Sequence, residues 1–257
     1  MRIDELTSRK ASQLIGKIDT IIIPVGTIEA HGPHCSLMSD VLITQKLADE
    51  VDQLAGDRVF VGPAIPYGHT WELQDQPGSH LVSKRVLAEY VLEVIKGFQK
   101  WKIKYVILLN GHGSVGFGTG GNIEPLHEAA ERATELGMKT LVLLWCFAPE
   151  AIKKITKDVD GHAGEAETSV VWFLGDKYVD KDAIPKAEHR LYSTQTQAQF
   201  SDIFDPELNR AVWPMAYWGK PSDASPEKGR LIHELLAKSL VEIIDAMRAG
   251  TLIKPYK

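Results

Sequence analysis

Short continuous runs of apolar residues alternate along the chain with stretches in which apolar residues recur every three or four positions. Four of the runs are rich in β-branched residues and do not alternate with polar ones. This pattern predicts strands that are buried on both faces. The predicted strands cover residues 20–26, 59–61, 105–109 and 140–145.

The periodic stretches predict helices, because apolar residues at helical spacing line one face. The stripe over 86–98 follows Ser83 as a predicted N-cap, and the stripe over 232–247 stops at Gly250. Further helices are predicted over residues 42–54, 123–136 and 165–174. Such strand–helix alternation predicts an α/β fold with helices on both faces of a mainly parallel sheet.

Length and composition bound the class of protein. The chain suits a single domain, 1–257, and its 44% hydrophobic and 25% charged residues are globular values. The net charge of −5 gives no sign of a nucleic-acid partner, and no apolar run reaches the roughly 18–20 residues that cross a bilayer. Cys35 and Cys146 cannot form a disulfide framework, so we expect a cytoplasmic protein.

Residues 176–227 are less regular and carry five prolines interleaved with aromatic residues. Two interpretations stay open. The segment is either a surface excursion packed by its own aromatics, or a lid or subunit contact.

A first group of candidate functional residues follows the first predicted strand. Glu29 and His31 lie two apart, so on an extended chain they point the same way and can converge on one ion. With Asp40 they form a carboxylate and imidazole set that suits zinc, manganese or iron. Alternatively, Glu29 and His31 only open a loop, and Asp40 or Ser39 caps the next helix.

A second group, Asn110-Gly111-His112-Gly113, directly follows the predicted strand 105–109. Ligands in open α/β sheets gather beyond the carboxyl ends of the strands, where both Glu29 and His112 fall. The glycine-rich stretch 113–121 either aims backbone N–H groups at an anion or is a flexible turn. It lacks the ending of a phosphate-binding loop.

A third group surrounds the start of the helix predicted over 165–174. His162 precedes Glu165 and Glu167. Acidic residues in a first turn can simply complement the helix dipole. The same residues are also suitable as a metal ligand and a proton shuttle.

In chain order, these groups resemble the creatininase (creatinine amidohydrolase) family. Residues 24–34, PVGTIEAHGPH, followed by Asp40, are similar to its PVGSxEQHGPHLPLxTD pattern. Residues 110–113 resemble its NGHGGN, and 162–169, HAGEAETS, its HAGExETS. Weaker blocks near 66–79 and 219–229 extend the resemblance over about residues 20–232.

The resemblance implies a three-layer α/β/α fold, a binuclear site for two divalent metal ions (Zn, Mn or Fe) and a homo-oligomer, often a hexamer. By position, Glu29 and His112 would hold one metal, His31 the other, and Asp40 would bridge them. Glu165 would be a further ligand. His162 would be the proton shuttle, and Glu167 would orient it.

The function implied is hydrolysis of a small-molecule substrate, a cyclic amide or formamide, by metal-activated water. Three alternatives remain: a formamidopyrimidine-nucleotide deformylase, a peptide-trimming enzyme, and a non-catalytic metal-binding scaffold.

Three departures from the family pattern bear on the substrate. Creatininase proper has a metal-binding glutamate two residues beyond the NGH histidine, where this chain has Ser114, which counts against creatinine as substrate. The glycine-rich insertion 113–121 must lie beside the metals and would reshape the pocket. Cys35 replaces a leucine, either as an oxidation-sensitive thiol or as a small buried hydrophobe.

Overall fold

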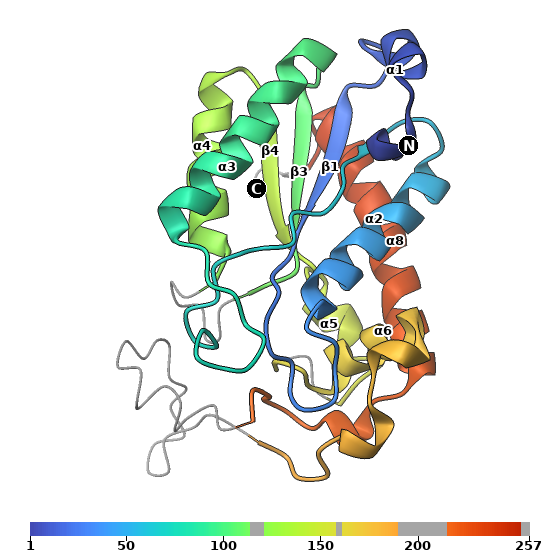
Figure 1. The fold of residues 1–257 in the computed structure, drawn as a ribbon. Coiled ribbons are helices and arrows are strands. Elements are labelled where there is room, and N and C mark those ends of the chain that lie inside the picture. Colours follow the sequence, from blue (N-terminus) through green and yellow to red (C-terminus); the bar gives the residue numbers. More distant parts are fainter. Residues whose placement is uncertain (114–120, 158–160, 190–214, 253–257) are drawn as a thin grey trace, which may run out of the picture.

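The fold is built on a parallel sheet. The structure, a computed structural model, describes residues 1–113, 121–157, 161–189 and 215–252. Within these residues the sheet has four strands in the order β2-β1-β3-β4. They are Thr20–Val25 (β1), Phe60–Val61 (β2), Tyr105–Asn110 (β3) and Lys139–Leu144 (β4). Figure 1 shows β1, β3 and β4 side by side. The four predicted strands are confirmed, with small shifts at their ends.

Register aligns the carboxyl ends of the three longer strands. Val25 is paired with Asn110, and Asn110 with Leu144. Because the strands are parallel, the segments that follow β1 and β3 leave the sheet side by side. The segments that carry Glu29 and His112 therefore start close together, as predicted from the sequence.

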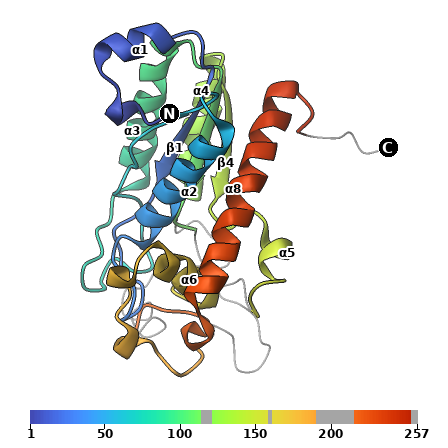
Figure 2. The same cartoon turned by 90° about the vertical axis from the view of Figure 1, so that its right-hand side faces the viewer.

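Helices cover both faces of the sheet, which explains why the strands are continuously apolar. One face packs against α3 (Lys84–Gly97) and α4 (Ile123–Glu135), and the other against α2 (Ser39–Ala55) and α8 (Pro226–Ala249). Figure 2 shows the sheet between α3 and α8. The predicted three-layer α/β/α arrangement is confirmed.

The remaining described elements are short, apart from α6. They are the α-helices Ser8–Leu14 (α1), Pro149–Ile152 (α5) and Glu165–Leu174 (α6) and the 3-10 helices Ile3–Glu5, Phe98–Trp101, Asp176–Tyr178, Lys181–Ala183 and Pro221–Asp223. No helix in the described part of the chain has the length and apolar character needed to span a membrane.

The helix ends follow the predicted signals only in part. Helix α3 begins after Ser83, but the Ser83 side chain makes no capping hydrogen bond. Helix α8 ends at Gly250, which has a φ of 69° as predicted for a left-handed cap. It begins earlier than its apolar stripe indicates, because Ser225 accepts a hydrogen bond from the Lys228 N–H and Pro226 fits the first turn.

Two segments with open predictions lie partly outside the described residues. Residues 190–214 belong to the irregular stretch 176–227, and 114–120 belong to the glycine-rich insertion. The predictions of a lid, a subunit contact or an anion-binding loop therefore stay predictions.

Two glycines let the start of α2 approach the ends of β1 and β3. A Cβ on Gly26 would lie 2.6 Å from the Val41 nitrogen, and one on Gly111 would overlap the Asp40 carbonyl oxygen. The Gly111 N–H also donates to the Val25 carbonyl oxygen at 2.7 Å. Close backbone approach of this kind requires glycine, and it brings Asp40 to the carboxyl end of the sheet.

We expect Gly111→Ala to destabilise the protein by about 1–3 kcal/mol, because the added methyl group must push α2 away from β3. Gly97→Ala is the matched control, since Gly97 is exposed, has a helical φ of −54° and has no atom within 4 Å of an added Cβ. Urea denaturation of the native protein and of the two variants measures their free energies of unfolding. Equal stability of the two variants would contradict this account of the approach.

Candidate metal centre

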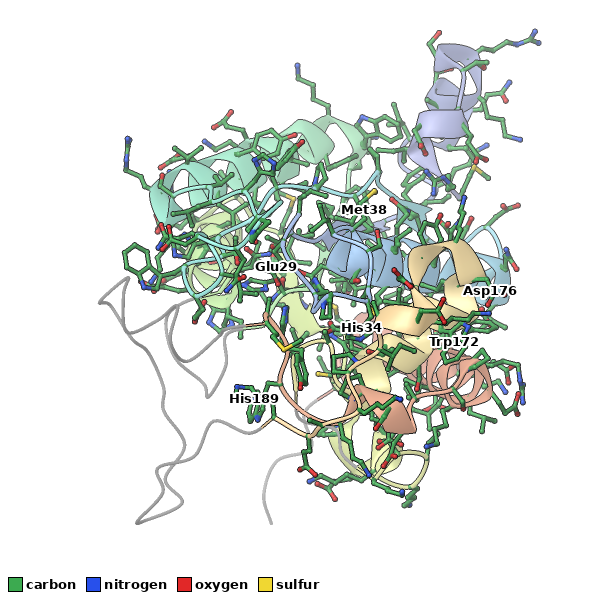
Figure 3. The ribbon with its side chains drawn as sticks, turned by 60° about the horizontal axis from the view of Figure 1, so that its bottom comes forward. Glu29, His34, Met38, Trp172, Asp176 and His189 are labelled. Atoms are coloured by element: carbon green, nitrogen blue, oxygen red, sulfur yellow. The ribbon has the colours of Figure 1, made fainter. Side chains whose placement is uncertain are left out.

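Five ionisable side chains from four segments meet beyond the carboxyl ends of β1 and β3. They come from the loop after β1, the first turn of α2, the loop after β3 and the first turn of α6. Figure 3 looks onto this end of the molecule and labels Glu29 among them. All five are buried: Glu29, His31, Asp40, His112 and Glu167.

The first three-residue group consists of Glu29, Asp40 and His112. Their ligand atoms lie within 4.8 Å of one another. His112 Nδ1 is 2.8 Å from Glu29 Oε1 and 3.6 Å from Asp40 Oδ2. Two carboxylates and one imidazole are a suitable donor set for zinc or manganese.

The second group consists of His31, Asp40 and Glu167 and meets the same distance limit. His31 Nε2 lies 3.1 Å from Asp40 Oδ1 and 3.7 Å from Glu167 Oε2. Asp40 is thus common to both groups, with one oxygen toward His31 and the other toward His112. The alternative in which Asp40 or Ser39 caps α2 is wrong, because Met38 is the N-cap and no side chain caps that end.

Unsatisfied carboxylate oxygens test whether the cluster fits metal ions. Glu29 Oε2 and Asp40 Oδ2 are buried and accept no hydrogen bond from any residue the structure describes. A buried charged oxygen without a donor is costly, so such atoms normally have a partner. A cation between these side chains would satisfy both oxygens. The residues therefore fit a metal centre.

The pKa values of the cluster diverge because its charges are close and shielded from water. Burial opposes charge on Glu29, yet His112 lowers its pKa to about 2. Burial, reinforced by Glu29, raises the pKa of Asp40 to about 6. Burial opposes protonation of His31 and His112. Neighbouring carboxylates nevertheless raise the His31 pKa well above its usual value and the His112 pKa to about 9.

His162 lies against this cluster with its ring fixed. Its Nε2 is 2.7 Å from the Ala30 carbonyl oxygen, so Nε2 carries the proton and donates it. Nδ1 then faces Glu29 Oε1 at 3.8 Å, and the ring centroid is 4.2 Å from that of His31. Burial, together with His31, lowers the pKa of His162 to about 4.

Glu165, predicted as a ligand, points elsewhere. Its Oε1 is 2.5 Å from Lys228 Nζ, and its Oε2 accepts a hydrogen bond from the Lys157 N–H at 2.9 Å. Residues two apart on a helix face opposite sides, so Glu167 enters the cluster where Glu165 does not. Glu165 belongs to none of the three-residue groups found among the described residues.

Similarity to known proteins extends over most of the chain. The creatininase family, described as creatinine amidohydrolase, matches residues 4–244 of the chain. This chain belongs to the creatininase family. The match covers more than the motifs alone and includes every residue of the cluster.

Individual relatives of this creatininase-family chain carry different names. The 3-dehydro-scyllo-inosose hydrolase of Thermotoga maritima is 33% identical over 282 aligned positions, covering 96% of this chain and 85% of the relative. The mycofactocin precursor peptide peptidase of Mycolicibacterium smegmatis is 29% identical over 231 residues, covering 88% and 85%. A solved structure titled "Creatininase Mn" has a TM-score of 0.76 at 23% identity over 95% of this chain and 96% of that one, which shows a shared fold.

Two asparagines hold the backbone around His112 in this creatininase-family site. Asn110 accepts from the His112 N–H at 3.1 Å and donates to the His112 carbonyl at 2.7 Å. Asn122 donates to Asn110 at 3.2 Å and to the Gly26 carbonyl at 3.3 Å. Asn122 is the N-cap residue of α4, but its side chain makes no capping hydrogen bond there. Asn110 could be found from the sequence because it is the first residue of the motif 110–113. Asn122 belongs to no motif described above.

A second network supports Glu167. His34 Nε2 donates to Thr168 Oγ1 at 2.9 Å, and Thr168 in turn donates to the Ala163 carbonyl at 3.0 Å. Ala163 has a φ of 51°, and its N–H donates to Glu167 Oε2 at 2.6 Å. The left-handed backbone at Ala163 thus aims an N–H at the carboxylate.

Cys35 behaves as a small, partly buried apolar group. Its Sγ lies 3.6 Å from Thr168 Oγ1. Burial raises the pKa of the thiol to about 12. Because the thiolate is the form that reacts, this environment favours the second of the two sequence interpretations.

We expect metal binding at pH 7 to release about two protons per chain, because metal ions bind neutral imidazole. The pKa values of His31 and His112 are raised above the usual value, so both rings are protonated at pH 7 and must lose their protons. Apparent metal affinity should therefore rise with pH through the titration of His112 near 9, and it should level off only when His31, whose pKa is also raised, has lost its proton. Calorimetry in buffers of different ionisation enthalpy measures the proton release. Affinity that is independent of pH would contradict the expectation.

Proposed function

We propose that this chain is a binuclear metal-dependent amidohydrolase that cleaves a C–N bond of a small-molecule amide. The observation that carries the proposal is the sharing of Asp40 between the two ligand groups. One carboxylate oxygen faces each group, so a single side chain can hold two cations together. Family membership supports hydrolysis as the reaction class.

The proposed ligands follow from the two groups. Glu29 and His112 would hold one ion and His31 and Glu167 the other, with Asp40 between them. Glu167 replaces Glu165 in the set expected from sequence. Zinc, manganese and iron all suit these donors. Two bound ions would lower the pKa of a shared water and polarise the amide carbonyl.

His162 is the proposed proton carrier. The Ala30 carbonyl fixes the proton on Nε2, which leaves Nδ1 as the atom that faces Glu29 and the cluster. A neutral imidazole at this place can take the proton of the attacking water and deliver it to the departing nitrogen. An amide nitrogen leaves poorly without that proton. The sequence predicted that Glu167 orients His162. In this proposal the Ala30 carbonyl orients the ring, and Glu167 is a metal ligand.

The preferred substrate class is a small cyclic amide or formamide. A second candidate is a peptide bond, which the similarity to the M. smegmatis peptidase over 88% of this chain favours. Both reactions use the same proposed ligands and the same proton carrier. The proposal also includes a cytoplasmic location, expected from Cys35 and Cys146, and homo-oligomeric assembly, for which the family resemblance implies a hexamer.

The metal-reconstituted protein, assayed against creatinine, hydantoins, formamidopyrimidines and short peptides, should hydrolyse at least one of these amides. We expect about two ions per chain, because two ligand groups share one bridge. A chelator should abolish turnover, and added Zn²⁺ or Mn²⁺ should restore it. Two bound ions without turnover on any of these substrates would favour the non-catalytic scaffold.

We expect His162→Ala to lose about 10²- to 10⁴-fold in kcat while keeping its metal, which is the usual contribution of a positioned acid–base group. His127→Ala is the control, because His127 is exposed on α4. Steady-state kinetics and metal analysis on the same samples check the prediction. Metal content that falls in parallel with activity would mean that His162 is a ligand, since it also lies near Glu29 and His31.

A further inference from the structure

Lys228 lies outside the cluster but is connected to it through α6. We propose that Lys228 is a positioning residue for the second ion: by pairing with Glu165 it fixes the first turn of α6 and so places Glu167 beside His31 and Asp40. This inference rests on the proposed function. It assigns Glu165 to support of the site and not to coordination.

The Glu165 carboxylate is held on both oxygens. Its side chain is 1% exposed, with Lys228 Nζ 2.5 Å from Oε1. The Lys157 N–H donates to Oε2 at 2.9 Å. A buried carboxylate needs such partners, because burial without them strongly disfavours its charge. Lys228 thus supplies an ion-pair partner for this buried carboxylate.

Lys228 is itself fixed at the start of α8. Its Nζ also donates to the Asp223 carbonyl at 2.7 Å, and its backbone N–H donates to Ser225 Oγ. The ammonium therefore bridges α6 and the turn that precedes α8. A side chain with two fixed acceptors has little freedom to move with the glutamate.

The two helices are joined by further contacts at the same place. Ser169 Oγ donates to the Glu165 carbonyl at 2.6 Å and accepts from the Ser225 N–H at 3.1 Å. A Cβ on Gly229 would overlap the Ser169 carbonyl oxygen, so the backbones approach as closely as glycine allows. The start of α6 is thus set by the start of α8.

The opposite side of the same turn carries the proposed ligand. Glu165 and Glu167 are two residues apart, so one faces α8 while the other faces the cluster. Glu167 Oε2 already accepts from the Ala163 N–H and lies 3.7 Å from His31 Nε2. Coordination distances tolerate errors of only about 0.2 Å. Rotation of this turn would therefore remove Glu167 from coordinating range.

The test measures equilibrium binding of Mn²⁺ and Zn²⁺ by the full chain, by competition with a chromogenic chelator, together with bound metal per chain. The variants are Lys228→Met, Glu165→Gln, the double variant, and Lys228→Arg. Arg230→Met is the matched control, because Arg230 forms exposed ion pairs with Glu227 and Glu234 on the same helix.

We expect Lys228→Met to weaken one of the two ions by about 10- to 100-fold, the usual effect of losing a partner outside the coordination sphere. The first ion should bind at close to native affinity, because Glu29, Asp40 and His112 are carried by segments other than α6. The double variant should recover most of the loss, since no charge is left unpaired. Lys228→Arg and Arg230→Met should bind both ions at close to native affinity.

Other outcomes distinguish this inference from the function on which it rests. If Glu165→Gln loses one ion whether or not Lys228 is present, Glu165 is a ligand and the inference is wrong. Native affinity for both ions in Lys228→Met also overturns it, while leaving the metal centre intact. A native protein that binds neither ion overturns the proposed function itself. If Lys228→Met does not fold, the double variant, whose stability is checked by thermal melting, decides between these outcomes.

Discussion

The energetic constraint on this structure is the concentration of negative charge at a place without water. Three carboxylates, those of Glu29, Asp40 and Glu167, are buried within reach of one another at the carboxyl end of the sheet. Protonated His31 and His112 offset part of this charge, and two of the carboxylate oxygens keep no donor among the described residues. Such a cluster is tolerated because cations can take the place of the missing donors. The rest of the architecture serves to hold these groups at fixed positions.

The support has two independent parts, one on each side of the cluster. On the sheet side, Asn110 and Asn122 clamp the backbone around His112, and Gly111 lets Asp40 approach. On the helix side, the Thr168 hydroxyl and the Ala163 N–H fix the turn that carries Glu167. Between them His162 has a pKa lowered to about 4 while that of His31 is raised. Neighbouring imidazoles with opposite shifts can divide their tasks, one binding a cation and the other moving a proton.

The strands and helices could be predicted because buried parallel strands and amphipathic helices leave distinct periodic patterns. The convergence of Glu29 and His112 also followed from topology, since both come after neighbouring strands. The roles of Glu165 and Glu167 could not be separated in this way. Helical spacing shows that they face opposite sides, but which side faces the cluster depends on how α6 packs on α8. Asn122 was missed for a related reason, because its partners Asn110 and Gly26 lie far from it in sequence.

The shared register of β1, β3 and β4 does not tolerate insertions or deletions within the strands, but it allows them in the loops that follow. Removing one residue within β3 would turn every later side chain of that strand to the opposite face and carry Asn110 and His112 with it. Added residues after Gly113 leave this pairing untouched, because they begin where the sheet has already ended. The loops at this end can therefore change in length or sequence, and so alter the surroundings of a substrate, while the strand pairing keeps Asn110 and His112 in place.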